Sequence, residues 1–254
     1  MAPIDVSARP FTCAYLPAQD PNETRIEFSF RSLDSGSSKK VASDIAALMT
    51  SVAIVGRRGG FSGEQFHPRE SSVILNGHRN LAGDQFHWSF AHMNVGDGLI
   101  LTLENLAHGL HCRNSHLEGV RIWTAFSDQG HGPATREVKV YQPLPYEYKL
   151  DVRSPTVVVD VEFVDRQDAE RWQPCRDEFD AWYLVAAAAG FSDEEFRPSE
   201  EVAIVLENEL QITSIGMQVV YGRSRVGRSG FQVLTNMLTS FHYGLGGLAL
   251  VEIT

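Results

Sequence analysis

Hydrophobic and polar residues alternate along several short segments of this chain, and longer segments place them at helical spacing. The segments 25–30 (RIEFSF) and 157–164 (VVVDVEFV) alternate and are rich in β-branched and aromatic residues, which is typical of strands with one buried face. Each is followed by a segment with one apolar stripe, which predicts an amphipathic helix. The stripes are Val41, Ile45, Leu48, Met49 and Val52 within 41–55, and Phe179, Trp182, Tyr183 and Ala186 within 176–190.

The rest of the chain continues this order twice. Two further strands are expected after each helix, then a second helix, then a closing strand. The expected ranges are 71–78, 84–93, 98–111 and 119–126 in the first half, and 201–210, 214–222, 230–243 and 248–254 in the second. An additional strand is expected before each set, at 11–17 and within 137–145.

One short motif occurs in both halves. GFSGEQFHPRE begins at Gly60 and GFSDEEFRPSE begins at Gly190, with seven identities in eleven positions. Such repetition predicts two copies of one structural unit. We therefore expect an α+β fold made by tandem duplication of a ferredoxin-like (βαββαβ) unit, with an extra strand at the start of each copy. The copies are expected at 9–126 and 136–254, with 127–135 as the linker.

The motif itself has the composition of a helix stop followed by a loop. Gly60 and Gly190 are expected in the left-handed conformation that ends many helices, and the proline that follows discourages further helix. The phenylalanines are expected to hold the loop on the core. We interpret the repeated motif as a structural element, not as a catalytic one.

Composition describes an ordinary globular protein. Hydrophobic residues make up 43% of the 254 positions and charged residues 21%. The three cysteines are widely spaced and favour neither a disulfide framework nor a cysteine zinc site. The first residues do not have the pattern of a secretory signal, and no apolar run is long enough to span a bilayer. A cytoplasmic protein without a membrane partner or a cofactor is expected, and its oligomeric state is left open.

The charge balance narrows the class of partner. With 32 acidic and 22 basic residues the formal net charge is −10, and no cluster of basic residues is interleaved with aromatic ones. Because such a chain repels a phosphate backbone, nucleic acid is not expected as a partner. A basic protein surface or a small polar ligand fits the composition better.

Strand alternation also sorts side chains between the two faces of each expected sheet. In the first copy it directs Phe28, Phe86, Trp88 and Phe90 towards the helices, and in the second copy it directs Phe163, Ile215 and Met217 there. The opposite, open faces are then polar. The candidate site residues on them are Arg25, Glu27, His87, Ser89 and Arg121 in the first copy, and Asp160, Glu162, Gln218 and Glu252 in the second.

Two arrangements of these open faces are compatible with the sequence. Arg25 occupies the position equivalent to Asp160, and Arg121 the position equivalent to Glu252, so the two faces could pack together or line one groove. Scattered charges are also the usual state of a solvated sheet face. Both arrangements remain open at this stage.

Histidine is concentrated in the first half, and one pair has a spacing that metal ligands use. His108 and His111 are three residues apart on the expected second helix and so share a face, with His87 or His116 as a possible third donor. No HExxH motif accompanies them, and surface or helix-capping roles account for such residues equally well. His111 and His242 occupy equivalent positions, which favours a shared capping role.

A loop in the second half is the remaining candidate. Arg223, Arg225 and Arg228 lie just before the expected helix 230–243, where free backbone amides could add to the guanidinium groups in holding an anionic ligand or an acidic partner. A solvated loop is the alternative. The sequence contains no nucleophile elbow, Walker loop or dinucleotide fingerprint.

Two functions follow from these observations. The first is a non-catalytic acidic protein that binds a partner protein through sheet faces or loops, as a toxin-neutralising protein does. The second is an enzyme acting on a small molecule in a cavity between the copies, lined by His87, Arg25, Glu27 and Arg121, with a metal at His108 and His111 as a variant of this hypothesis. The first rests on the acidic balance and the missing catalytic motifs.

Overall fold

The structure is a computed structural model. It describes residues 12–31, 33, 35–81, 84–114, 116–125, 144–149, 156–193, 196–199, 201–222 and 224–254. The expected linker 127–135 and most of the expected strand 137–145 lie outside these residues, as does Arg223.

The fold is mixed α+β, with two five-stranded sheets and four helices in the described part of the chain. The first sheet has the order β1-β5-β2-β4-β3, with β1 parallel to β5 and the other neighbours antiparallel. Its strands are β1 (Thr12–Pro17), β2 (Glu23–Phe30), β3 (Ser72–Leu81), β4 (Gln85–Met93) and β5 (Leu117–Thr124).

The second sheet repeats this arrangement. Its order is β6-β10-β7-β9-β8, again with one parallel pair, β6 with β10. The strands are β6 (Tyr146–Tyr148), β7 (Thr156–Phe163), β8 (Val205–Ile212), β9 (Gly216–Gly222) and β10 (Leu248–Ile253). Two short 3-10 helices, η2 (Pro68–Glu70) and η3 (Ala169–Trp172), lie in connections.

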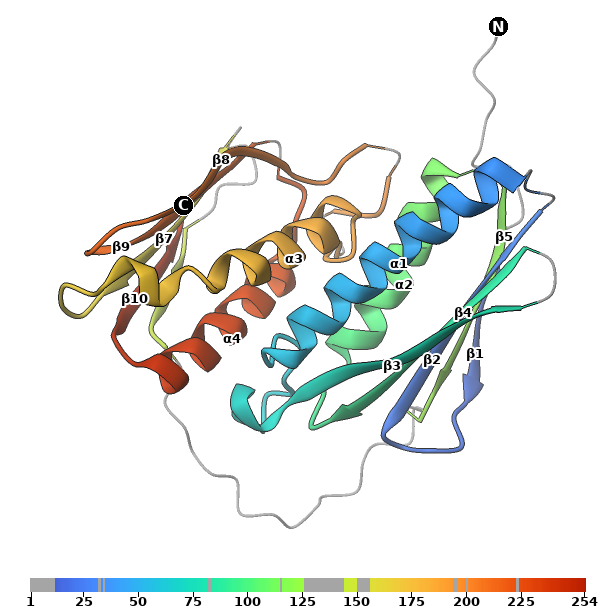
Figure 1. The fold of residues 1–254 in the computed structure, drawn as a ribbon, viewed down its shortest axis with the longest axis horizontal. Coiled ribbons are helices and arrows are strands. Elements are labelled where there is room, and N and C mark those ends of the chain that lie inside the picture. The colour runs from blue at the N-terminus through green and yellow to red at the C-terminus, as the bar shows by residue number, and fades with distance from the viewer. Residues whose placement is uncertain are drawn as a thin grey trace, which may run out of the picture.

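The helices form the middle of the molecule (Figure 1). They are α1 (Ser35–Arg57), α2 (Gly98–Arg113), α3 (Cys175–Ala187) and α4 (Arg228–Leu245). α1 and α2 cover one face of the first sheet, α3 and α4 cover one face of the second, and the two helix layers pack against each other. The outer face of each sheet therefore points away from the other sheet.

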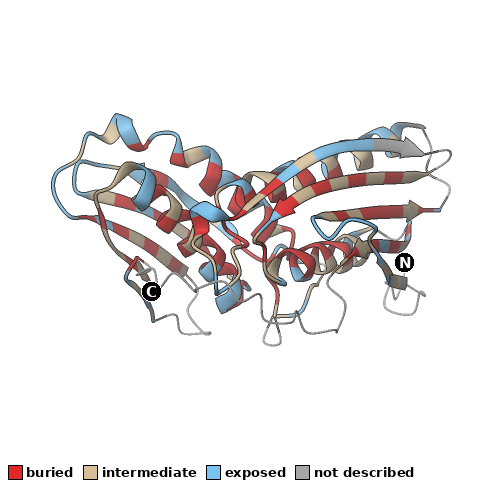
Figure 2. Ribbon diagram, turned by 90° about the horizontal axis from the view of Figure 1, so that it is seen from below, coloured by how far each residue is buried: buried red, intermediate tan, exposed pale blue. Residues whose placement is uncertain are grey.

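Residues alternate in burial along the strands as the sequence pattern predicts (Figure 2). Phe28, Phe86, Trp88 and Phe90 are at most 3% exposed because they face α1 and α2. One side chain was placed wrongly. Ile215 is 68% exposed, because the strand begins at Gly216 and Ile215 belongs to the tight turn 213–216.

The duplicated motif lies where the two helix layers meet. The carbonyl oxygen of Gly60 accepts a hydrogen bond from Asn236 Nδ2 on α4, at 3.1 Å. In the other direction, Asn105 Nδ2 on α2 donates to the carbonyl oxygens of Gly190 and Ser192, at 3.3 and 2.8 Å. Each motif is thus bound by an asparagine from the other half, and the motif residues help to join the halves.

The two motif glycines make this contact possible by their small size. A Cβ on Gly60 would lie 3.0 Å from Val233 of α4, and one on Gly190 would lie 3.1 Å from Leu106 of α2. Neither glycine is left-handed. The expected left-handed conformation belongs to the residue before each of them, Gly59 (φ 74°) and Ala189 (φ 68°), two residues after α1 ends at Arg57 and α3 ends at Ala187.

Gly59 gives a stability prediction with a matched control. A methyl group there would lie 2.1 Å from the carbonyl oxygen of Pro68, in a backbone conformation that already costs L-residues about 1–2 kcal/mol. We expect Gly59→Ala to lower the free energy of unfolding by about 2–4 kcal/mol. Gly63→Ala, where a Cβ meets only ordinary contacts of 3.5 Å or more, should change it by less than about 0.5 kcal/mol. Urea unfolding of both variants measures the difference, and equal effects would contradict it.

Candidate functional site

The outer face of the first sheet brings together the predicted residues of the first half. Glu27 on β2 lies directly between His87 on β4 and Arg121 on β5, and Arg25 is paired with Ser89 in the next row. All five residues of this group are therefore on neighbouring strands, as the alternation predicts.

A shallow depression of about 530 Å³ opens over these strands. Its lining includes Glu23, Arg25, Glu27, His78, His87 and Trp123. At one end Arg25 Nη2 donates to Glu23 Oε2 at 2.6 Å, and Ser89 Oγ donates to Glu23 Oε1 at 2.7 Å. These two hydrogen bonds, with that from Arg25 the stronger, hold the pKa of Glu23 below its ordinary value, so the carboxylate stays ionised.

Glu27 is the most buried charged residue of this face. It is 7% exposed, and its Oε1 lies 3.1 Å from Arg121 Nη2 as an ion pair. This ion pair is not a hydrogen bond, so Oε1 is a buried acceptor without a hydrogen-bond donor among the described residues. Such groups are uncommon in folded proteins because each costs free energy.

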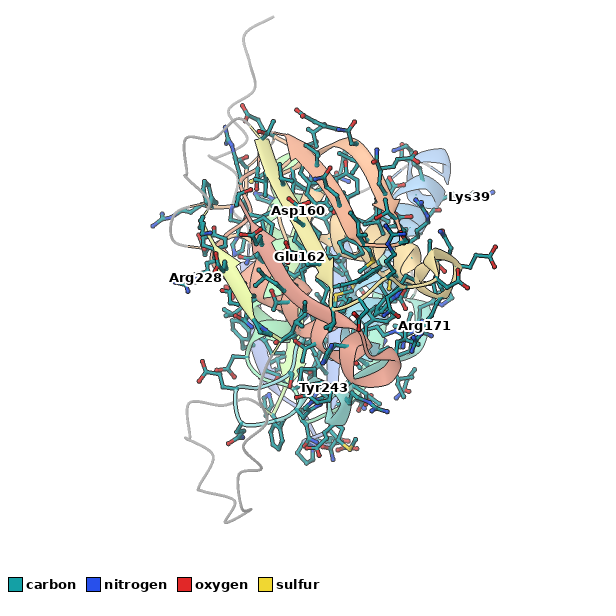
Figure 3. The ribbon with its side chains drawn as sticks, turned by 90° about the vertical axis from the view of Figure 1, so that its left-hand side faces the viewer. Lys39, Asp160, Glu162, Arg171, Arg228 and Tyr243 are labelled. Atoms are coloured by element: carbon teal, nitrogen blue, oxygen red, sulfur yellow. The ribbon has the colours of Figure 1, made fainter. Side chains whose placement is uncertain are left out.

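The outer face of the second sheet gathers the predicted residues of the second half (Figure 3). Asp160 lies between Glu252 on β10 and Gln218 on β9, and Gln218 Nε2 donates to Asp160 Oδ1 at 2.7 Å. Glu162 follows two positions later on β7, on the same face. A second depression of about 530 Å³ lies here, lined by these four residues and by Gln211 and Ile215 among others.

This second face is acidic. Asp160, Glu162 and Glu252 carry negative charge, and Glu147 lies beside Glu252 on the neighbouring edge strand. Lys149 pairs with both Glu147 and Glu252, the latter at 3.4 Å. The face therefore keeps a negative excess.

The two sets of residues do not share a groove. The four helices lie between the sheets, so Arg25 and Asp160 are on opposite outer faces of the molecule. The expected packing of one open face on the other, and the expected cavity between the copies, are not formed by the described residues. The physical reason is that the helices also bury apolar side chains against the other half, since Leu106 of α2 lies beside Gly190, Val233 of α4 lies beside Gly60, and both are at most 8% exposed.

The histidines of the first half are dispersed. His108 lies 3.9 Å from Glu104 on the same helix, His111 Nδ1 is 3.1 Å from the carbonyl oxygen of Leu117, and His116 Nδ1 is 3.1 Å from that of Arg31. His87 lines the depression on the outer face of the sheet, whereas His108 and His111 are on α2 at the opposite face. Within the described ranges no group of three or more His, Cys, Asp or Glu side chains could hold a metal ion.

His111 and His242, the pair expected to share a capping role, make different contacts, and the capping role itself stays a prediction. His111 Nδ1 lies near the carbonyl oxygen of Leu117, the first residue of β5. His242 Nδ1 is buried and has no hydrogen-bond partner among the described residues. The two equivalent positions therefore have different environments.

The arginine loop does not form an anion site among its described residues. Arg225 pairs with Glu201 at 2.6 Å, and Arg228 lies over the ring of Tyr148. The start of α4 is already next to a carboxylate, since a Cβ on Gly227 would lie 1.7 Å from Asp193 Oδ2. The two arginines therefore point to separate partners.

Sequence reasoning missed several residues that line the two depressions. Glu23 precedes the range expected for its strand, and Trp123 was assigned to a strand without being placed on its outer face. Asn76 and Gly77 lie where β3 is irregular, between Leu75 and Gly77, and no simple alternation predicts such a position. The strand partners of Arg25 and Glu27 were the only available signal.

Comparisons with known proteins add little. No family model matches the sequence, and no curated protein matches it. Among solved structures, one from Alicyclobacillus acidocaldarius described as a "putative M16-like peptidase" aligns with 88% of this chain and 75% of its own, at 10% identity and a TM-score of 0.21. A likeness this low supports no argument about function. None of the helices within the described residues has the length and apolar character needed to cross a bilayer.

Proposed function

We propose that this chain is a non-catalytic binding protein that docks a basic partner protein on the outer face of its second sheet. The observation that carries the proposal is the row of Glu252, Asp160 and Gln218 across three strands, with Glu162 beside it. These side chains are on a sheet face that no other part of the described chain covers.

Electrostatic complementarity supports a basic partner. The whole chain has a formal net charge of −10, and the face adds a local acidic cluster to this overall field. Such a field attracts a cationic surface and accelerates its association, and it disfavours acidic competitors. A basic toxin that this chain neutralises would meet this requirement, and so would another basic protein of the same compartment.

Apolar residues at one end of the acidic row add a second requirement. Ile215 is 68% exposed and Val164 is 62% exposed, and both lie where β7 and β9 meet the turn 213–216. A partner that fits would place arginine or lysine over Asp160 and Glu162 and an apolar residue near Ile215. Mixed contacts of this kind are typical of protein interfaces.

We also propose that the architecture arose by tandem duplication of a ferredoxin-like unit, at 9–126 and 136–254. Without β1 and β6, the strand orders are β5-β2-β4-β3 and β10-β7-β9-β8, and each set follows the same chain order of strands and helices. The reciprocal hydrogen bonds of Asn105 and Asn236 support a pseudo-two-fold relation between the halves. A superposition of the two halves in an experimental structure tests this.

Oligolysine, added to uniformly ¹⁵N-labelled protein, tests where a cationic partner binds. We expect it to shift the side-chain amide signals of Gln211 and Gln218, which lie in the acidic depression, and to leave those of Asn76 in the first depression unchanged. The shifts should vanish as salt rises, because exposed charges are screened beyond about 10 Å at 0.1 M salt. Shifts confined to Asn76, or unaffected by salt, would refute this assignment.

A further inference from the structure

The depression on the first sheet differs from the acidic one in its charge. Its two carboxylates are each matched by an arginine, Glu23 by Arg25 at 2.6 Å and Glu27 by Arg121 at 3.1 Å. The fixed charges therefore cancel within the protein. A site of this kind offers little net attraction to an ion, and it favours a ligand that is polar but uncharged.

The other polar groups around the depression can together donate and accept hydrogen bonds. Asn76 has an amide, and His78 and His87 have imidazole rings, while the Ser89 hydroxyl donates to Glu23 and keeps its acceptor capacity. Hydroxyl groups of a ligand also donate and accept, so they match this set better than purely cationic or purely anionic groups.

Glu27 supplies a second and independent indication. The carboxylate lines the depression, the residue is 7% exposed, and its Oε1 has no hydrogen-bond donor within the part of the chain that the structure describes. Arg121 covers this oxygen, and its side chain is 48% exposed and able to move. A ligand hydroxyl that entered beside Arg121 would give the buried acceptor the donor it lacks.

Trp123 gives the depression an apolar wall. It is the half-buried tryptophan of the chain, whereas Trp88, Trp172 and Trp182 are at most 2% exposed. Its ring lies edge to face with that of His87, with 6.4 Å between the centroids. An aromatic ring beside groups that bind hydroxyls suits a compound with apolar C–H faces and hydroxyl edges.

We infer that the depression on the outer face of the first sheet binds a neutral polyhydroxylated ligand of the sugar class, with Trp123 against the ring and Glu27 accepting from a hydroxyl. A volume of about 530 Å³ is within the range of small-molecule sites, which is roughly 300–1,000 Å³. The site is distinct from the acidic face on the second sheet. Either proposal can therefore fail without the other.

Tryptophan fluorescence tests this inference, because Trp123 is the tryptophan that a ligand can reach. The probes are glucose, galactose, maltose and lactose, with glucuronate and glucosamine as charged counterparts. We expect at least one neutral sugar to give a saturable change with a dissociation constant in the millimolar range, as a shallow site allows. The charged counterparts should bind roughly tenfold more weakly or not at all.

Two variants identify the residues involved. Trp123→Phe keeps an aromatic ring and should weaken binding roughly threefold, and Glu27→Gln should weaken it roughly tenfold, as measured by saturation-transfer NMR on the sugar signals. Thermal unfolding of each variant shows whether the fold is kept. If a variant does not fold, the binding site is located in the wild-type protein instead, by the shift of the Asn76 side-chain amide signal on addition of the sugar. Absence of binding by all four neutral sugars, or tighter binding of the charged ones, would overturn the inference.

Discussion

Replacing Arg58 by alanine should lower the free energy of unfolding by about 3 kcal/mol, because it leaves a buried carboxylate without its cation. Arg58 follows α1, and its Nε donates to Glu178 Oε1 of α3 at 2.7 Å. The Glu178 side chain is only 4% exposed, and its second oxygen, Oε2, has no hydrogen-bond partner among the described residues. The guanidinium also lies 4.7 Å from the ring centroid of Phe241 on α4, so the substitution removes packing as well.

The pair joins the two halves, and a double-mutant cycle isolates its contribution. Glu178→Ala removes the buried charge itself and should cost less than Arg58→Ala, since the remaining Arg58 is 39% exposed and can be solvated. The double variant should then lose less free energy of unfolding than the sum of the losses in the two single variants. Urea unfolding at neutral pH measures all four proteins.

A neutral side chain at position 178 provides the control for this explanation. In a Glu178→Gln background no buried charge remains, so the defect of Arg58→Ala should shrink. A defect that is equal in both backgrounds would mean that lost packing on Phe241, not the orphaned carboxylate, accounts for the effect.

The sequence predicted well which side chains lie on which face of each sheet, and it predicted poorly how the sheets and helices are layered. Alternation over β2 and β4 is a local property, so the buried Phe28, Phe86 and Phe90 and the outward Arg25 and His87 followed directly. The surface against which the helices of each half pack is not a local property. The charges at Arg25 and Asp160 suggested that the two open sheet faces meet, whereas in the structure the two helix layers meet.

A signal for the helix contact was present in the small residues at the end of α3. Ala188 and Ala189 are at most 6% exposed, and a Cβ on Gly109 of α2 would lie 2.6 Å from the carbonyl oxygen of Ala188. Small residues at such positions allow helices to approach closely. The repeated GFS motif carried the same information, but as a helix stop it had a sufficient local explanation.

The candidate sites were predictable only in part for a related reason. Each row of polar residues lies on strands whose register follows from hairpin pairing, so Glu27, His87 and Arg121 could be grouped in advance. Whether they form a depression depends on the irregularity of β3 near Asn76 and on the half-buried Trp123. Neither can be derived from alternation.

Neutralising the acidic face of the second sheet should weaken the binding of a cationic partner by about 10- to 100-fold at low salt. The variant carries Asp160→Asn, Glu162→Gln and Glu252→Gln, which keep the shapes of the side chains. Each exposed charge contact contributes roughly 0.5–1 kcal/mol, and three of them together account for this range. Because the changes are at the surface, stability should change by less than about 1 kcal/mol.

A matched variant separates the face from the overall charge. Asp44→Asn, Glu64→Gln and Glu118→Gln remove the same number of charges from exposed residues of the first half. This control lowers the general attraction equally, but it leaves Asp160, Glu162 and Glu252 in place.

The ratio of the two affinities for oligolysine, measured by isothermal titration calorimetry, is the most direct test of the acidic face as the binding surface. The proposal predicts that the Asp160, Glu162 and Glu252 variant binds at least about fivefold more weakly than the control variant. Equal affinities of the two variants would show that only net charge matters, and they would contradict a binding site on the second sheet.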